Sequence, residues 1–249
     1  MQIVLNGTLT NFLAVNPHQK QTLLILHGWS QSSLHWQIIL DNLPSTVTGI
    51  ALDLPAFGST QPLPGNPGVP EYSDFVKNFI KKQKLKNVVL LGHSFGGQIA
   101  VDFSLRYPKL ISHLILVSPA CIRDQKPNQK SQIAKKLKPF INALSPKIYD
   151  YIFSLIASKN YLNSTPIQRV VLNKILYQDY SKKLQDITVD TAIIWGDKDV
   201  TIENKSKFLA ETIPHSHLYV IYGANHSAQI SAPQKFISLL NHLLKMYAD

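Results

Sequence analysis

The amino-acid sequence predicts an α/β fold with a mostly parallel, eight-stranded sheet and helices on both faces. Short apolar runs alternate along most of the chain with longer segments of helical apolar spacing, which is typical of parallel strands joined by helices. The 249 residues are enough to bury one core of this kind. The hydrophobic fraction of 45% is ordinary for a globular domain.

The first two predicted strands form a hairpin. Apolar runs at 2–5 and 8–15 flank Asn6-Gly7, a dipeptide typical of two-residue hairpin turns. Further apolar runs predict the other six strands, near 22–26, 48–53, 87–91, 113–118, 190–195 and 217–222. Helical spacing predicts helices near 33–42, 71–83, 96–107, 202–213 and 232–247. The segment from Pro62 to Pro70 holds four prolines and two glycines and is predicted to be an ordered surface loop.

The most informative motif follows the run at 87–91. Residues 92–97 read Gly-His-Ser-Phe-Gly-Gly, a G-x-S-x-G pattern where a strand is expected to end and a helix to begin. Such a turn strains the serine backbone and holds its hydroxyl clear of the sheet. The flanking residues must be small, because the strand and helix backbones pass close together. A glycine-rich turn without chemistry has the same local pattern, so the rest of the chain decides.

A serine nucleophile needs a base and an acid that orients the base, and both follow later predicted strands. Asp197 and Asp199 follow the strand at 190–195, and His226 follows the strand at 217–222. The order serine, acid, histidine is the one found in hydrolases that use this turn. Because the carboxyl ends of parallel strands meet at one edge of a sheet, these side chains are predicted to lie together there.

Together these motifs resemble the α/β-hydrolase family over nearly the full chain. The acid segment at 195–199 and Asn225-His226 are similar to family motifs, although Asn225 stands where glycine is commoner. The His27-Gly28 loop after the strand at 22–26 is also similar to a family motif. Residues 53–60 are similar to the family segment D-x-P-G-F-G-x-S, with Ala56 in place of the usual glycine. Several motifs in the family order are far more specific than any one of them.

The resemblance implies a role for each site residue. Ser94 would be the nucleophile and His226 its base. Asp199 would be the acid, because the family places it at the fourth position of G-x-x-D, and Asp197 would then be an exposed turn or cap residue. The oxyanion donors would be the backbone N–H groups of Trp29 and Phe95.

Residues 119–187 interrupt the alternation of strands and helices. They contain helical apolar patterns, such as the one from Ile148 to Ile156. The resemblance implies a helical cap at 119–187 over an α/β-hydrolase core made of 1–118 and 188–249. Caps exclude water and shape the pocket. The alternative is a structural insertion that covers the edge of the sheet.

Positive charge is concentrated in residues 119–187. This segment has twelve Lys and Arg residues against four Asp and Glu residues, which accounts for eight of the ten net positive charges of the chain. Such a patch can steer an acidic substrate or an acidic carrier protein, although a solvated lysine-rich surface has the same composition. The sequence contains no nucleic-acid-binding motif, so nucleic-acid binding is not expected.

The predicted function is cleavage of small-molecule carboxylic esters through an acyl-enzyme on Ser94. Allied alternatives are a carbon–carbon bond hydrolase and a methyl-ester esterase acting on an acidic carrier protein. An alternative of a different class is a ligand-binding receptor that keeps the triad without turnover. Dehalogenase and epoxide hydrolase functions are disfavoured, because those families use a carboxylate where Ser94 stands.

The remaining composition indicates a protein without cofactor or membrane segment. Cys121 is the single cysteine, so no intramolecular disulfide can form. The N-terminus lacks the pattern of a signal peptide, and no apolar run is long enough to span a bilayer, so we expect a cytoplasmic protein. No His, Cys or acid cluster has metal-ligand spacing, and no G-x-G-x-x-G follows a strand, so neither a metal nor a nucleotide cofactor is expected. The oligomeric state is left open.

Overall fold

The computed structural model describes residues 1–123 and 162–248. The helical pattern predicted from Ile148 to Ile156 lies outside the described residues, as does most of the positive charge of the 119–187 segment. The described part of that segment is therefore limited to its two ends, 119–123 and 162–187.

The predicted mostly parallel eight-stranded sheet is confirmed. The strand order is β1-β2-β4-β3-β5-β6-β7-β8. β1 pairs antiparallel with β2 and β2 antiparallel with β4, and every other neighbouring pair is parallel. The strands are β1 (Gln2–Leu5), β2 (Thr8–Val15), β3 (Gln21–Leu26), β4 (Val47–Leu52), β5 (Val88–His93), β6 (His113–Val117), β7 (Thr191–Gly196) and β8 (Ser216–Ile221).

Two layers of helices cover the two faces of the sheet. One hydrophobic core includes apolar side chains of α2, α3, α7 and α8, and the other includes those of α1, α9 and α10. Alternate residues of β3 divide between the cores, Leu24 and Leu26 in the first and Leu23 and Ile25 in the second, as the two-residue period of a strand requires. The described helices are η1 (Ser33–Trp36), α1 (Gln37–Leu40), α2 (Val69–Lys82), α3 (Phe95–Arg106), η2 (Pro108–Leu110), α7 (Pro166–Ile175), η3 (Ser181–Asp186), α8 (Ser206–Thr212), α9 (Ala228–Ser231) and α10 (Pro233–Met246).

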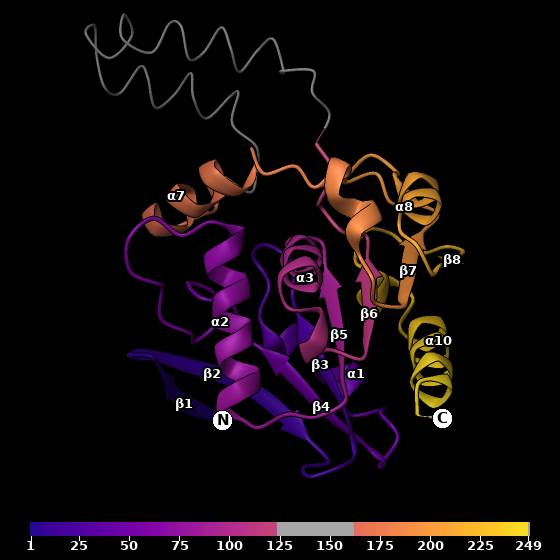
Figure 1. The fold of residues 1–249 in the computed structure, drawn as a ribbon, viewed down its shortest axis with the longest axis horizontal. Coiled ribbons are helices and arrows are strands. Elements are labelled where there is room, and N and C mark those ends of the chain that lie inside the picture. The colour runs from indigo at the N-terminus through magenta and orange to yellow at the C-terminus, as the bar shows by residue number, and fades with distance from the viewer. Residues whose placement is uncertain (124–161, 249) are drawn as a thin grey trace, which may run out of the picture.

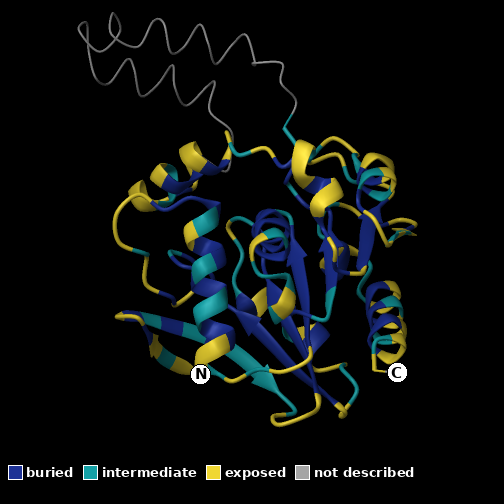
Figure 2. Cartoon of the chain, viewed as in Figure 1, coloured by how far each residue is buried: buried dark blue, intermediate teal, exposed yellow. Residues whose placement is uncertain are grey.

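Burial follows the position of each strand in the sheet. Every residue of β3, β4, β5 and β7 is buried, and these strands carry the buried colour in Figure 2. Strands covered by helices on both sides are nearly continuous apolar runs, which is why the sequence marks them clearly. The edge strands β1 and β8 keep exposed residues.

Two predicted helices are shorter in the structure. The helix expected at 33–42 is a 3-10 turn, η1, followed by the short α1, because the Trp36 backbone has φ −112° and ψ 3°, outside the helical range. The helix expected at 202–213 begins only at Ser206, after a segment tied to Asp199 by the N–H of Thr201.

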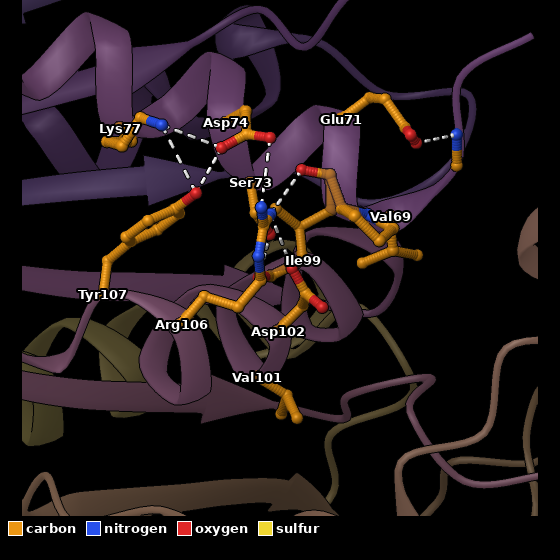
Figure 3. A network of polar contacts seen from close by, with 12 residues as sticks. Val69, Glu71, Ser73, Asp74, Lys77, Ile99, Val101, Asp102, Arg106 and Tyr107 are labelled. Atoms are coloured by element: carbon orange, nitrogen blue, oxygen red, sulfur yellow. Dashed lines mark hydrogen bonds and ion pairs between the residues drawn. The ribbon is translucent and has the colours of Figure 1, made fainter.

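A polar network joins α2 to α3 (Figure 3). Asp74 on α2 accepts hydrogen bonds from Lys77, Arg106 and Tyr107. Arg106 also donates to the carbonyl of Pro70 at the start of α2. The network fixes α3, the helix that starts immediately after Ser94, against its neighbour in the same layer.

Candidate active site

Ser94 lies in the turn between β5 and α3, with φ 51° and ψ −109°. A positive φ is costly for a residue with a side chain and persists where the surroundings impose it. Here they do, because a Cβ on Gly96 would lie 2.2 Å from the Leu26 carbonyl oxygen and one on Gly92 would lie 2.4 Å from the Gly96 carbonyl oxygen. The close approach of these backbones fixes the turn that holds the Ser94 side chain.

The structure brings Ser94, His226 and Asp199 together in one chain of hydrogen bonds. His226 Nε2 lies 3.0 Å from Ser94 Oγ, and His226 Nδ1 lies 2.8 Å from Asp199 Oδ2. The Asp199 side chain is completely covered and the His226 side chain is 13% exposed. The other oxygen of Asp199 accepts the N–H of Thr201 at 2.9 Å.

The environment of Asp199 keeps it ionised. Burial acts to raise the pKa of this carboxyl, but the hydrogen bond from His226 and its charge, followed by the N–H of Thr201, hold the pKa below its ordinary value. An ionised carboxylate only accepts, so His226 carries its proton on Nδ1. Its Nε2 therefore presents a lone pair to Ser94 Oγ, the arrangement that a general base requires.

Asp197 lies on the same loop and takes a different partner. It is exposed, and its Oδ1 accepts the N–H of Gly223 after β8. The two candidate carboxylates therefore point in different directions. Asp199 faces His226, and Asp197 faces the turn after β8.

The two N–H groups expected to hold an oxyanion are oriented by the carbonyls that precede them. The Gly28 carbonyl accepts from His27 Nδ1 at 2.8 Å, and the Ser94 carbonyl accepts from the N–H of Ala120 at 3.0 Å. In a trans peptide the N–H points opposite to the C=O, so the N–H groups of Trp29 and Phe95 point away from these contacts. Neither N–H donates to an acceptor among the residues that the structure describes.

His27 holds its loop as a neutral imidazole. Its Nε2 accepts the N–H of Leu54 at 3.0 Å, so the proton is on Nδ1 and is donated to Gly28. Burial lowers the pKa of His27 to about 4, against an opposing contribution from the Gly28 hydrogen bond. A single fixed tautomer therefore connects the loop after β3 to the loop after β4.

The structure shows how the chain accommodates the two residues, Ala56 and Asn225, that stand where the family motifs usually have glycine. Ala56 has φ +69°, the left-handed region that explains why glycine is usual there. Its carbonyl accepts a hydrogen bond from Gln168 on α7. Asn225 uses its side chain to accept the N–H of Ser227, which closes the turn next to His226.

The described end of the 119–187 segment lies close to the candidate oxyanion loop. Trp29 Nε1 donates to Ser164 Oγ at 3.2 Å, just before α7. The Trp29 ring also packs edge-on against Phe57 and Phe95, with ring centroids 4.9 and 5.4 Å apart. In Figure 1 the arrowheads of β5 and β6 point toward the side on which α7 lies.

Two residues beside His226, His93 and Gln31, were not assigned to the site from the sequence. His93 Nε2 lies 2.9 Å from the His226 carbonyl oxygen. Gln31 contacts His93, Gly28 and Ser227. A histidine preceding the nucleophile was the only available signal, and nothing in the local pattern marks Gln31.

Other groups in the described ranges give no metal centre. Within residues 1–123 and 162–248, no three His, Cys, Asp or Glu side chains are grouped so that they could hold a metal ion. Cys121 is buried, and burial raises the pKa of its thiol to about 12. None of the helices in these ranges has the length and apolar character needed to cross a membrane.

Comparison with known proteins identifies the family. Residues 21–164 match a family model described as the alpha/beta hydrolase fold. The chain is 24% identical to monoacylglycerol lipase ABHD6 of Homo sapiens, over 90% of this chain and 75% of that protein. It is 28% identical to the pimeloyl-[acyl-carrier protein] methyl ester esterase of Hamiltonella defensa, over 92% of this chain and 94% of that protein.

A solved structure shows the same fold. The esterase from Exiguobacterium antarcticum superposes with a TM-score of 0.76 at 22% identity, and the match covers 97% of both chains. At that identity the likeness concerns the arrangement of the backbone alone.

Proposed function

This chain belongs to the α/β-hydrolase family, and from that premise we propose that it is a serine hydrolase that cleaves carboxylic esters through an acyl-enzyme on Ser94. One observation carries the proposal. Ser94, in a backbone conformation of positive φ, has its Oγ 3.0 Å from a histidine whose other nitrogen lies 2.8 Å from a buried carboxylate. Such a chain of groups supplies a nucleophile, its base and the group that orients the base.

In the proposed reaction, Ser94 Oγ attacks the ester carbonyl carbon while His226 Nε2 takes the hydroxyl proton. The tetrahedral oxyanion is held by the N–H groups of Trp29 and Phe95. The intermediate then expels the alcohol, which receives the proton from His226. Water, deprotonated by His226, attacks the acyl-enzyme, and collapse of the second intermediate frees the carboxylic acid and returns the proton to Ser94. Asp199 stabilises the imidazolium in both halves.

The oxyanion donors are supported by their fixed directions. The carbonyls of Gly28 and Ser94 are held by His27 and Ala120, so the following N–H groups need no rearrangement to receive a charge. Preorganised donors of this kind contribute about 3 kcal/mol each to lowering the barrier. The same two N–H groups would favour a carbonyl compound over substrates that develop no oxyanion.

Hydrolysis of short-chain p-nitrophenyl esters tests the proposal. Ser94→Ala should fold normally and lose turnover, whereas Ser59→Ala, an exposed serine on another loop, should match the wild type. A fluorophosphonate probe should label Ser94 alone, as read by peptide mass. Wild-type turnover in Ser94→Ala would refute the assignment. Labelling without hydrolysis of any ester in a chain-length series would instead support the receptor alternative.

A second candidate, a methyl-ester esterase acting on an acidic carrier protein, is favoured by the charge of the 119–187 segment. That segment holds eight of the ten net positive charges, and a 28% identical relative bears this activity in its name. Acidic partners would be steered toward it at low ionic strength.

Salt dependence separates the two candidates. The screening length falls from about 30 Å at 0.01 M to about 8 Å at 0.15 M ionic strength. Hydrolysis of pimeloyl methyl ester on acyl-carrier protein should then slow as salt rises, while a neutral p-nitrophenyl ester should change little. Reversing Lys135, Lys136 and Lys138 to Glu should lower kcat/KM for the carrier substrate only. Equal salt dependence for both substrates would mean that the 119–187 segment is a solvated basic surface that does not steer an acidic partner.

A further inference from the structure

The loop that carries His226 must cross part of the sheet to reach Ser94. His226 follows β8, and β6 and β7 lie between β8 and β5 in the strand order. At roughly 4.8 Å per strand, three spacings amount to about 14 Å. The imidazole nevertheless lies 3.0 Å from Ser94 Oγ at the end of β5. Its backbone therefore needs an attachment on the β5 side of the sheet.

His93, the last residue of β5, provides that attachment. Its Nε2 lies 2.9 Å from the carbonyl oxygen of His226, and the two ring centroids are 5.0 Å apart. A carbonyl oxygen only accepts, so Nε2 carries the proton and donates it. The bond holds the backbone of His226 and leaves both of its ring nitrogens for Ser94 and Asp199.

Gln31 connects the loop that carries His226 to the candidate oxyanion loop. Its Oε1 accepts the N–H of Gly28 at 3.1 Å. The same oxygen lies 3.2 Å from His93 Nδ1, but with the His93 proton on Nε2 both atoms are acceptors, so this pair is a contact and not a hydrogen bond. Gln31 Nε2 donates to Ser227 Oγ at 3.4 Å. Gly28 leaves the room for this arrangement, because a Cβ there would lie 2.7 Å from His93 Nδ1. One side chain thus contacts the loops after β3 and β8 and the end of β5.

His93 can hold His226 without adding a charge beside it. Full burial, and after it the neighbouring His226, lower the pKa of His93 to about 3, so the ring is neutral at physiological pH. A charged ring at this distance would oppose the imidazolium that general-base catalysis forms on His226. The neutral form with its proton on Nε2 is the one that suits the contact with the carbonyl.

We propose that His93 is a positioning residue for His226, and that Gln31 joins the histidine loop to the oxyanion loop through its bonds to Ser227 and Gly28. This inference rests on the proposed function, since it assigns both residues a part in the same hydrolysis. In this role neither residue needs to touch the substrate. Their effect is on the placement of the base relative to Ser94 Oγ, where an error of about 1 Å can cost 100-fold in rate.

A pair of variants at one position separates positioning from packing. His93→Leu keeps apolar bulk and removes the N–H, while His93→Gln keeps an amide N–H at a reach close to that of Nε2. We expect kcat for a p-nitrophenyl ester to fall about 10- to 100-fold in His93→Leu with KM within about 3-fold, and to recover to within about 5-fold of wild type in His93→Gln. The rate of fluorophosphonate labelling of Ser94 should follow kcat.

The thermal midpoints of the two variants decide the interpretation. If His93→Gln and His93→Leu lose the same activity at equal thermal midpoints, the N–H to His226 has no positioning role and the inference is overturned. Unchanged kcat in His93→Leu overturns it as well.

A variant outside the core covers the case in which His93→Leu does not fold. Gln31→Met, at a half-buried loop position, removes the bonds to Gly28 and Ser227 and should lower kcat about 5-fold or more with KM unchanged. Wild-type kcat in Gln31→Met contradicts the inference. A wild-type protein that neither hydrolyses esters nor reacts with the fluorophosphonate would refute the proposed function itself, which distinguishes the two failures.

Discussion

Replacing Asp199 with asparagine changes one atom beside His226. In the structure, Oδ2 of Asp199 faces His226 Nδ1 and Oδ1 faces the N–H of Thr201, so both oxygens meet donors. An asparagine must turn its amide N–H2 toward one of these donors. If it faces His226, the imidazole places its proton on Nε2 and has no lone pair for Ser94. If it faces Thr201, two N–H groups oppose each other at a side chain that is itself fully covered.

The size of the effect follows from that conflict. An unsatisfied buried donor costs about 1–3 kcal/mol, so the amide turns to favour the wrong histidine tautomer. The lost ionic stabilisation of the imidazolium adds to this in the transition state. Where such a triad carboxylate is neutralised, kcat falls by about 10⁴, which equals roughly 5.4 kcal/mol of barrier. We expect Asp199→Asn to lower kcat by about 10³- to 10⁴-fold.

The assay is p-nitrophenyl ester turnover, run beside Asp197→Asn as the matched control. Asp197 is exposed, and an asparagine oxygen can still accept the N–H of Gly223, so this variant should stay within about 3-fold of wild type. Circular dichroism and thermal midpoints establish that both variants fold.

The reverse ranking of the two variants would move the acid to Asp197 and refute the geometric argument. Equal, small losses in both folded variants would mean that no carboxylate orients His226, and the triad would have to be abandoned.

Three further predictions concern the frame of the site. Gly96→Ala should destabilise the protein by about 3 kcal/mol, because its Cβ would lie 2.2 Å from the backbone oxygen of Leu26. The control Gly65→Ala has no atom within 4 Å of its Cβ and is strained only by its φ of +74°, so it should cost about 1–2 kcal/mol. Equal urea midpoints for the two variants would contradict this prediction. His27→Leu should lower kcat about 10-fold, which is less than the 10²- to 10³-fold cost of removing an oxyanion donor. His27→Asn can still donate a hydrogen bond to the Gly28 carbonyl and should lose less activity. The same kcat in both variants would show that the Gly28 contact is dispensable. Asp74 has its pKa lowered from 3.8 to about 2, since the hydrogen bonds from Tyr107, Lys77 and Arg106 outweigh its burial. The stabilisation by its ionised form is therefore present above about pH 4 and lost as the pH falls toward 2. The urea midpoints of wild type and Asp74→Asn should accordingly converge over that range, and a gap independent of pH would be inconsistent with the lowered pKa.

The sequence by itself determined those features that depend on neighbours along the chain. The Asn6-Gly7 turn, with φ of 50° and 84°, and the buried strands follow from local conformational preference and apolar period. The Ser94 turn is of the same kind, since Gly92 and Gly96 lie within two residues of the serine whose backbone they allow to bend. The roles of Ser94, Asp199 and His226, and the cap assigned to 119–187, are expectations of the resemblance that the proposed experiments test.

The tertiary structure alone decided which side chains meet above the sheet. Asp197 and Asp199 differ by two positions on one loop, and the path of that loop past β8 directs only Asp199 to His226. His93 lies 133 positions from His226, and Gln31 lies 196 from Ser227. Apolar period reports which residues are buried, but it carries no information about how far a loop reaches across neighbouring strands. The contacts that hold His226 over β5 are set by those paths, so no local pattern in the sequence could predict them.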